Sequence, residues 1–131
     1  MSHAAPVVLM VEDDESLCRI VSRYLRGRGY KVEVSDSAEA AQVALGRGVR
    51  PDLILLDLNL PGDTGWDLVR GGAIAEAGSP PVVIASATAV SPKRLAEFGV
   101  AGYLPKPFPL ETLIAIVERL THPEATAPSH E

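Results

Sequence analysis

Five residues with charged or reactive side chains stand at the ends of short apolar runs. They are Glu12 and Asp13 after the run 7–11, Asp57 near the end of 53–58, Ser86 at the end of 82–86, and Lys106 after 102–105. Most of these runs are rich in Val, Ile and Leu, which is typical of buried strands of a parallel sheet. The carboxyl ends of such strands share one edge of the sheet, where ligands of these folds bind. We therefore expect the five side chains to lie close together.

Together these side chains have the chemistry of a site for a phosphoryl group. Carboxylates packed together raise one another's pKa values unless a cation lies among them. Oxygen ligands of this kind select a hard cation such as Mg²⁺, which keeps several of its waters. Lys106 would add a second positive charge, and Ser86 a hydroxyl. Phosphoryl oxygens need positive charge and hydrogen-bond donors on every side.

Each residue also has a purely structural explanation. Asp13 or Asp14 can cap the helix that follows, as a carboxylate after a strand often does. Ser86 can be an ordinary loop hydroxyl and Lys106 a turn residue, although prolines on both sides hold the backbone of Lys106 stiffly. Asp57 resists such an explanation, because aspartate is rarely buried without a partner. The expected convergence of all five residues at one edge of the sheet indicates a functional site more strongly than any one of them does alone.

The strands that position these residues alternate with helices along the chain. Strands are predicted over 7–11, 30–35, 53–58, 82–86 and 102–105. In the second strand, Tyr30, Val32 and Val34 alternate with polar residues and form its buried side. The strands 7–11 and 53–58 are the most apolar and are expected at the centre of the sheet.

Helices are predicted between the strands from apolar spacing and from capping residues. The first helix is predicted from an apolar stripe made of Leu17, Ile20, Val21, Tyr24 and Leu25. The second is predicted to begin after the cap Ser37, the third to begin near Trp66, the fourth to span 92–98 after the cap Ser91, and the fifth to span 109–120, opened by Pro109. Gly71 and Gly72 weaken the third helix by about 1 kcal/mol each relative to alanine. Five strands alternating with five helices predict an α/β fold with helices on both faces of a parallel sheet.

Length, charge and cysteine content narrow the class of protein. A chain of 131 residues is one domain's worth. Its formal charge of −5 gives no general attraction for nucleic acid or anionic lipid. A single cysteine, Cys18, forms no internal disulfide and suits a reducing compartment. The run 7–11 is too short and too soon acidic for a signal peptide or membrane span. We expect a soluble cytoplasmic protein.

The segments around the five residues resemble the receiver domain of bacterial two-component response regulators. The resemblance rests on Val11 to Asp14, Asp57 to Gly62, Ser86-Ala87 and Gly102 to Phe108, in this order and spacing, and spans 6–120. It implies a single doubly wound, flavodoxin-like (βα)5 domain with a five-stranded parallel sheet of order 2-1-3-4-5. The ends, 1–5 and 121–131, are expected to be flexible.

The resemblance also implies a role for each matching residue. Asp57 would be the phosphoacceptor, and Lys106 would hold a phosphoryl oxygen. Mg²⁺ would be held by Asp13, Asp57 and the backbone carbonyl of Asn59, and Glu12 would reach it through water. Ser86 would be the switch hydroxyl, and Tyr103 would change rotamer on phosphorylation. The Lys106–Pro107 bond is expected to be cis. The sequence departs from the family pattern in Glu12, where aspartate is commoner, in Pro105, and in a slightly short segment between Ser86 and Lys106.

The resemblance implies a signalling domain that catalyses only its own phosphorylation and dephosphorylation. The phosphoryl donor would be a sensor histidine kinase or a histidine phosphotransfer protein. Because little chain follows residue 120, we expect output by contact with a downstream protein through helix 92–98, strand 102–105 and helix 109–120. Ile116 lies off the apolar stripe of the last helix and is a candidate for that contact.

Three alternatives share features with this hypothesis. A phosphohydrolase of the haloacid dehalogenase type also uses an aspartate at a strand end, but needs a second carboxylate where this chain has Asn59. A flavodoxin-like electron carrier would need a phosphate loop where this chain has acids after the first strand. A pseudo-receiver that acts only as a binding scaffold would not need the reactive residues present here. A metal-binding and phosphorylation assay separates these alternatives.

The remaining distinctive residues receive structural interpretations. Cys18 is expected to be a packing residue on the first helix, and Trp66 to pack at the start of its helix near the site, where its fluorescence would report metal binding. His3, His122 and His130 fall in the chain ends and lack the spacing of a metal site.

Overall fold

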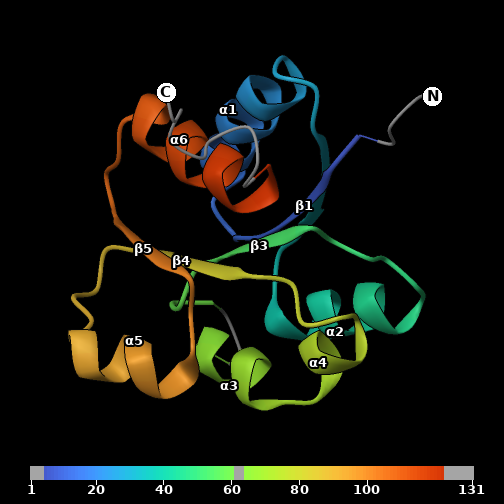
Figure 1. The fold of residues 1–131 in the computed structure, drawn as a ribbon, viewed down its shortest axis with the longest axis vertical. Coiled ribbons are helices and arrows are strands. Elements are labelled where there is room, and N and C mark those ends of the chain that lie inside the picture. Colours follow the sequence, from blue (N-terminus) through green and yellow to red (C-terminus); the bar gives the residue numbers. More distant parts are fainter. Residues whose placement is uncertain (1–4, 61–63, 123–131) are drawn as a thin grey trace, which may run out of the picture.

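The computed structural model describes residues 5–60 and 64–122. Its centre is one sheet of five parallel strands in the order β2-β1-β3-β4-β5 (Figure 1). The strands are β1 (Val7–Val11), β2 (Lys31–Ser35), β3 (Leu53–Leu56), β4 (Val82–Ser86) and β5 (Gly102–Pro105). The predicted fold class and strand order are confirmed, and β1 and β3 are internal strands as expected.

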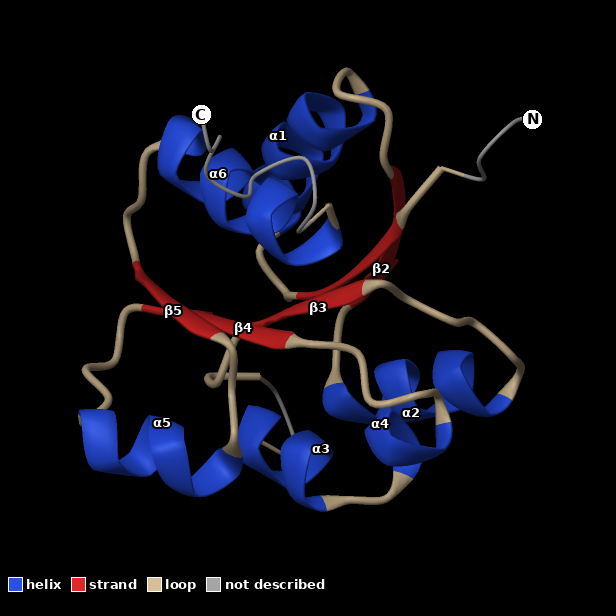
Figure 2. Ribbon diagram, viewed as in Figure 1, coloured by secondary structure: helices blue, strands red, loops and turns tan. Residues whose placement is uncertain are grey.

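Helices cover both faces of the sheet. They are α1 (Glu15–Arg26), α2 (Ala38–Gly46), α3 (Gly65–Arg70), α4 (Ala73–Glu76), α5 (Pro92–Phe98) and α6 (Leu110–Thr121). Figure 2 shows α1 and α6 on one side of the sheet and the other four helices on the opposite side. This arrangement leaves the strand ends free to carry a site.

Side chains of the central strands alternate between the two layers. In β1, Val8 and Met10 join the core beneath α1 and α6, whereas Leu9 and Val11 join the core on the other face. All four residues of β3 are buried, so this strand is covered on both faces. Asp57 follows a strand without a solvent-facing side.

Most predicted helix starts are confirmed by their capping hydrogen bonds. The side chain of Asp14 accepts from the Leu17 N–H at 3.1 Å and caps α1. Ser37 caps α2 and Ser91 caps α5 in the same way. Gly99 ends α5 at φ 65°, a left-handed conformation that glycine adopts without strain.

Several predicted element boundaries are wrong, including the start of β2, which lies at Lys31 rather than at residue 30. The helix near Trp66 is divided into α3 and α4 at Gly71 and Gly72, because the extended ψ of 170° at Gly71 interrupts the helix. The third strand ends at Leu56 rather than continuing through 58, although the Asp57 N–H still donates to the Val11 carbonyl at 3.0 Å. The last helix spans Leu110–Thr121 rather than the predicted 109–120.

The side chains predicted to be buried at Ile20 and Val34 are exposed. Ile20 is 54% exposed and Val34 is 46% exposed, while Ser35 beside it is buried. For Val34 the reason is the position of β2 at the edge of the described sheet. Apolar alternation alone does not distinguish an edge strand from an internal one.

Two other expectations concern particular parts of the chain. The Lys106–Pro107 bond is cis, as expected. Within the described residues, no helix is long and apolar enough to cross a membrane. His3, His130, Pro61 and Gly62 lie outside the described residues.

Candidate functional site

The loops that follow β1, β3, β4 and β5 bring the predicted residues together at one edge of the sheet. Glu12 and Asp57 each follow the last residue of a strand directly, as does Lys106. Backbone hydrogen bonds continue past these ends, from Glu12 N–H to the Ser35 carbonyl at 2.9 Å and from Lys106 N–H to the Ser86 carbonyl at 3.0 Å. The sheet itself therefore fixes where the side chains begin.

The Lys106 ammonium joins two buried carboxylates. It lies 2.6 Å from Oε1 of Glu12 and 3.3 Å from Oδ2 of Asp57. The other oxygens are also held: Oε2 of Glu12 accepts from the Asp14 N–H at 3.2 Å, and Oδ1 of Asp57 accepts from the Asn59 N–H at 3.1 Å. These bonds aim Oδ2 of Asp57 toward the only ammonium group of the site.

Burial and charge act in opposite directions on this ion network. Burial raises the pKa of Glu12, and the hydrogen bond from Lys106 only partly offsets that effect. Burial acts to lower the pKa of Lys106, but its hydrogen bond and charge interactions with Glu12 and Asp57 outweigh burial and raise it. Lys106 is therefore a cation throughout the neutral range.

Three carboxylates form a group that could hold a metal ion. One ligand oxygen from each of Glu12, Asp13 and Asp57 lies within 4.8 Å of the others, and Asp13 alone is exposed. Both oxygens of Glu12 already accept hydrogen bonds. Both oxygens of Asp57 are held as well, so Asp13 is the freest of the three ligands. An oxygen-only donor set fits a hard cation such as Mg²⁺.

The Ser86 hydroxyl is fully buried beside this group. Its oxygen accepts from the Thr88 N–H at 3.1 Å and from the side-chain amide of Asn59 at 3.4 Å. The structure places Ser86 at the site edge, as predicted, in hydrogen-bond contact with the loop after β4.

Thr88 is a site residue that the sequence analysis missed. Its hydroxyl accepts from the Asn59 amide at 2.8 Å, and its carbonyl accepts from the Tyr103 hydroxyl at 3.0 Å. Thr88 thereby joins the loop after β3 to β5. Thr88 could have been found from the sequence by its position two residues after Ser86, in the loop that follows the same strand.

Gly65 has a packing role at the site. A Cβ at this position would lie 2.5 Å from the Asp57 carbonyl oxygen, so only glycine lets α3 begin so close to Asp57. The Gly65 N–H donates to the Leu58 carbonyl at 3.3 Å. The start of α3 is in this way fitted against the backbone of the phosphoacceptor candidate.

Trp66 packs at the start of its helix, as expected, and its ring stacks on Phe98 of α5 at 4.4 Å between centroids. The expectation for Ile116 needs correction. Ile116 is half-buried and packs over Gly102 against the core, which argues against a free contact residue. The absence of a side chain at Gly102 creates the space that Ile116 fills.

The comparisons with known proteins agree with this geometry. A family model described as the response regulator receiver domain matches residues 8–118. The chain is 39% identical over 111 residues to the DNA-binding response regulator MtrA of Mycobacterium tuberculosis, covering 84% of this chain and 48% of MtrA. The chain spans about half the length of the curated relatives that it matches.

Solved structures share the fold over nearly the whole chain. The non-phosphorylated receiver domain of HemR from Leptospira biflexa superposes with a TM-score of 0.76 at 31% identity, covering 96% of this chain and 99% of that one. The receiver domain of the sensor histidine kinase PA1611 from Pseudomonas aeruginosa, solved with magnesium in its active-site cleft, gives a TM-score of 0.77 at 28% identity, covering 90% and 98%.

Proposed function

Because the chain belongs to the receiver-domain family of response regulators, we propose that Asp57 accepts a phosphoryl group from a sensor histidine kinase or a histidine phosphotransfer protein. The observation that carries this proposal is the environment of Asp57: a buried carboxylate, 3.3 Å from the Lys106 ammonium and beside a second and third carboxylate. In a signalling domain such a site is phosphorylated once in each signalling cycle and does not turn over a separate substrate.

The transfer is a displacement at phosphorus. An oxygen of Asp57 forms the new P–O bond while the P–N bond to the donor histidine breaks and returns its electron pair to the imidazole. The Asn59 N–H holds Oδ1 of Asp57, which orients the carboxylate. Lys106 keeps its proton and pairs with a phosphoryl oxygen as negative charge arrives.

The proposal assigns Mg²⁺ to Asp13, Asp57 and the backbone carbonyl of Asn59. A bound Mg²⁺ neutralises charge on the phosphoryl oxygens. Glu12 forms an ion pair with Lys106, in which one carboxylate oxygen lies 2.6 Å from the ammonium. Its other oxygen accepts from the Asp14 N–H, so both oxygens are already engaged and contact with the metal through water suits Glu12 better.

We assign the output of the site to the path through Ser86, Thr88 and Tyr103. Phosphoryl oxygens on Asp57 would draw the Ser86 hydroxyl away from the Thr88 N–H that it now accepts from. Movement of Thr88 would release the Tyr103 hydroxyl from the Thr88 carbonyl. The surface formed by α5, β5 and α6 would then present a different shape to a downstream protein.

The same residues argue against a phosphohydrolase. An Asp-nucleophile hydrolase would need a carboxylate at the position of Asn59, whose amide instead donates to Thr88 and Ser86. A phosphorylation-independent scaffold would not need a lysine pairing two buried acids. The experiment below distinguishes all three.

The test is phosphorylation by acetyl phosphate with Mg²⁺, followed by intact mass spectrometry. One phosphoryl group should be added to the wild type, none to Asp57→Asn, and one to the exposed control Asp36→Asn. Asp13→Ala or EDTA should abolish labelling. A wild type that remains unlabelled by acetyl phosphate and by histidine kinases would favour the scaffold, and release of phosphate without any phosphoprotein would favour the hydrolase.

The output path is tested on the same proteins with beryllofluoride and NMR. Amide shifts should spread from Asp57 to Tyr103 and α5 in the wild type. Ser86→Ala should retain the shifts near Asp57 and lose most of those around Tyr103. A full remote response in Ser86→Ala would show that the hydroxyl does not carry the signal.

A further inference from the structure

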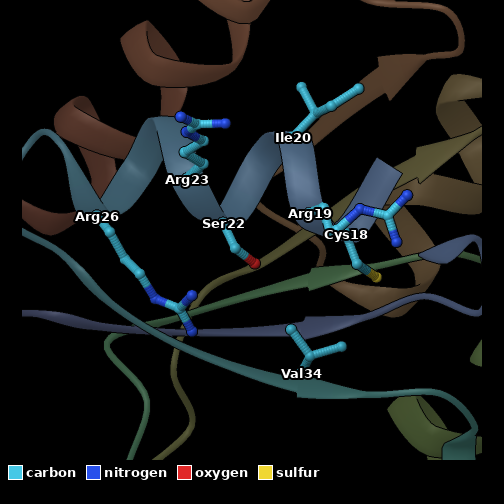
Figure 3. A pocket seen from close by; sticks show the side chains of 7 residues that line it. All are labelled: Cys18, Arg19, Ile20, Ser22, Arg23, Arg26 and Val34. Atoms are coloured by element: carbon cyan, nitrogen blue, oxygen red, sulfur yellow. The ribbon is translucent and has the colours of Figure 1, made fainter. Parts of the chain in front are cut away.

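An open groove of about 630 Å³ lies between α1 and the edge strand β2 (Figure 3). Figure 3 shows Cys18 and Ser22 pointing from α1 toward β2, with Val34 rising from the strand below them and Arg26 extending down beside the strands. Arg19 lies beside Cys18, and Arg23 points away from Val34. None of these residues takes part in the proposed phosphoryl transfer.

All charge along the groove is positive, although the whole chain has a formal charge of −5. Arg19, Arg23 and Arg26 line it, and no lining residue is acidic. Among the described residues, none of the three forms an ion pair with a carboxylate. Arg26 donates one N–H to the Val32 carbonyl at 3.1 Å, which leaves most of its guanidinium donors available.

The Ser22 hydroxyl is the second indication of a ligand. Ser22 is 5% exposed, and its oxygen has no hydrogen-bond partner in the described part of the chain. Buried polar atoms in proteins are nearly always hydrogen-bonded, so an unpaired one needs an explanation. Here the hydroxyl points into a groove whose rim is made of arginine side chains.

We propose that this groove binds a phosphate monoester that carries a small apolar group. A guanidinium pairs with two phosphate oxygens at once, and the Ser22 hydroxyl can donate to a third. A phosphate monoester of charge between about −1.5 and −2 matches several unpaired arginines better than a carboxylate of charge −1. The exposed side chain of Val34 provides apolar contact beside the anion.

The neighbouring hollow explains why the anion would stay at the arginine end. That hollow shares Cys18, Arg19 and Val34 with the groove and continues to Glu12 and Asp13. Carboxylates there repel an anion, so the charge along α1 changes sign from one end to the other. The size of the groove lies in the range of about 300–1,000 Å³ that small-molecule sites occupy.

The experiment is an NMR titration of the full chain with butyl phosphate, without divalent cations. Saturable amide shifts should centre on Ser22, Arg26 and Val34. Ser22→Ala and Arg26→Gln should each raise the Kd at least tenfold, whereas Arg47→Gln, an exposed arginine at the end of α2, should leave it within twofold. Butyrate should bind about tenfold more weakly than butyl phosphate, and butanol should not bind.

Ser22→Ala keeps the test independent of folding. Removal of an unpaired hydroxyl should leave the melting temperature of the free protein unchanged or higher, while the increase caused by butyl phosphate is lost. The variant should still be phosphorylated at Asp57. Shifts that do not saturate, that centre on Lys106, or that persist in Ser22→Ala with an unchanged Kd would overturn the proposal.

Discussion

The two helices on either side of β5 in the chain are attached to the protein in different ways. α6 buries Leu113, Ile114 and Val117 against the sheet, whereas α5 has no buried residue. Figure 2 shows α6 above the sheet beside α1 and α5 below it beside α3. One helix is part of the core, and the other lies on its surface.

α5 is attached mainly by rings and cations. Phe98 stacks on Trp66 at 4.4 Å, the guanidinium of Arg94 lies 5.2 Å from the centre of the Trp66 ring, and that of Arg70 lies 5.5 Å from the centre of the Phe98 ring. An aromatic pair contributes about 0.5–1.5 kcal/mol beyond its buried area. Each fully buried aliphatic side chain of α6 contributes about 1.5–3 kcal/mol. Small changes at the site can therefore shift α5 more easily than α6.

This difference bears on the proposed output. Tyr103 precedes α6 and follows α5 in the chain, and its hydroxyl is bonded to the loop that leads into α5. A change at Thr88 would reach a weakly attached helix on one side and a firmly packed one on the other. We expect α5 to be the part that moves.

The largest effect that separates the two helices should come from truncating one leucine in each. Leu113→Ala should lower the free energy of unfolding by about 3 kcal/mol, because a fully buried leucine leaves a cavity. Leu95→Ala on α5 should cost less than about 1 kcal/mol, since Leu95 is only half-buried. Urea denaturation followed by circular dichroism measures both. Equal losses would refute the distinction between the helices.

The sequence predicted the site better than it predicted the helices that would respond to it. The reactive residues follow strands of a parallel sheet, whose carboxyl ends share one edge, so their convergence could be inferred before any coordinates. Ser91 also marked the start of α5 correctly. Such signals are local in the chain.

The errors concern contacts that depend on tertiary structure. Ile116 looked available for a partner because helical spacing does not reveal that Gly102 leaves a space for it. Val34 looked buried because alternation does not show which strand forms the edge of the sheet. Thr88 was missed because its importance lies in hydrogen bonds to Asn59 and Tyr103, which are distant in sequence.

A smaller effect should follow from removing the ring that attaches α5. Phe98→Ala should lower the free energy of unfolding by about 1–2 kcal/mol and speed hydrogen exchange in α5 more than in α6. Phe108→Ala is the matched control, because Phe108 is also half-buried but packs against the core on the opposite side. If α5 exchange stays unchanged in Phe98→Ala, the aromatic contact does not hold this helix.

The smallest effect concerns the end of α6, which a tyrosine attaches to the start of β2. The Thr121 hydroxyl donates to the Val117 carbonyl at 2.8 Å, so the Tyr30 hydroxyl must be the donor in its 2.9 Å bond to Thr121. Burial raises the pKa of Tyr30 above its usual value of 10.0, and the nearby charge of Glu118 adds to this effect. Because the folded pKa is the higher one, the stability contributed by the neutral phenol is complete below about pH 10 and is lost as pH rises through the folded pKa.

Tyr30→Phe should therefore cost about 1 kcal/mol at pH 7, and the difference in unfolding free energy between it and the wild type should shrink above pH 10. Other groups with raised pKa values in this range, including Cys18 at about 11, are present in both proteins and cancel in the comparison. Tyr24→Phe is the control, since the Tyr24 hydroxyl bonds only the exposed Arg28, at 3.3 Å. Urea denaturation at a series of pH values gives the measurement. A difference that stays constant from pH 7 to pH 11 would mean that the donated hydrogen bond does not secure the end of α6, and that its core residues alone account for the contrast with α5.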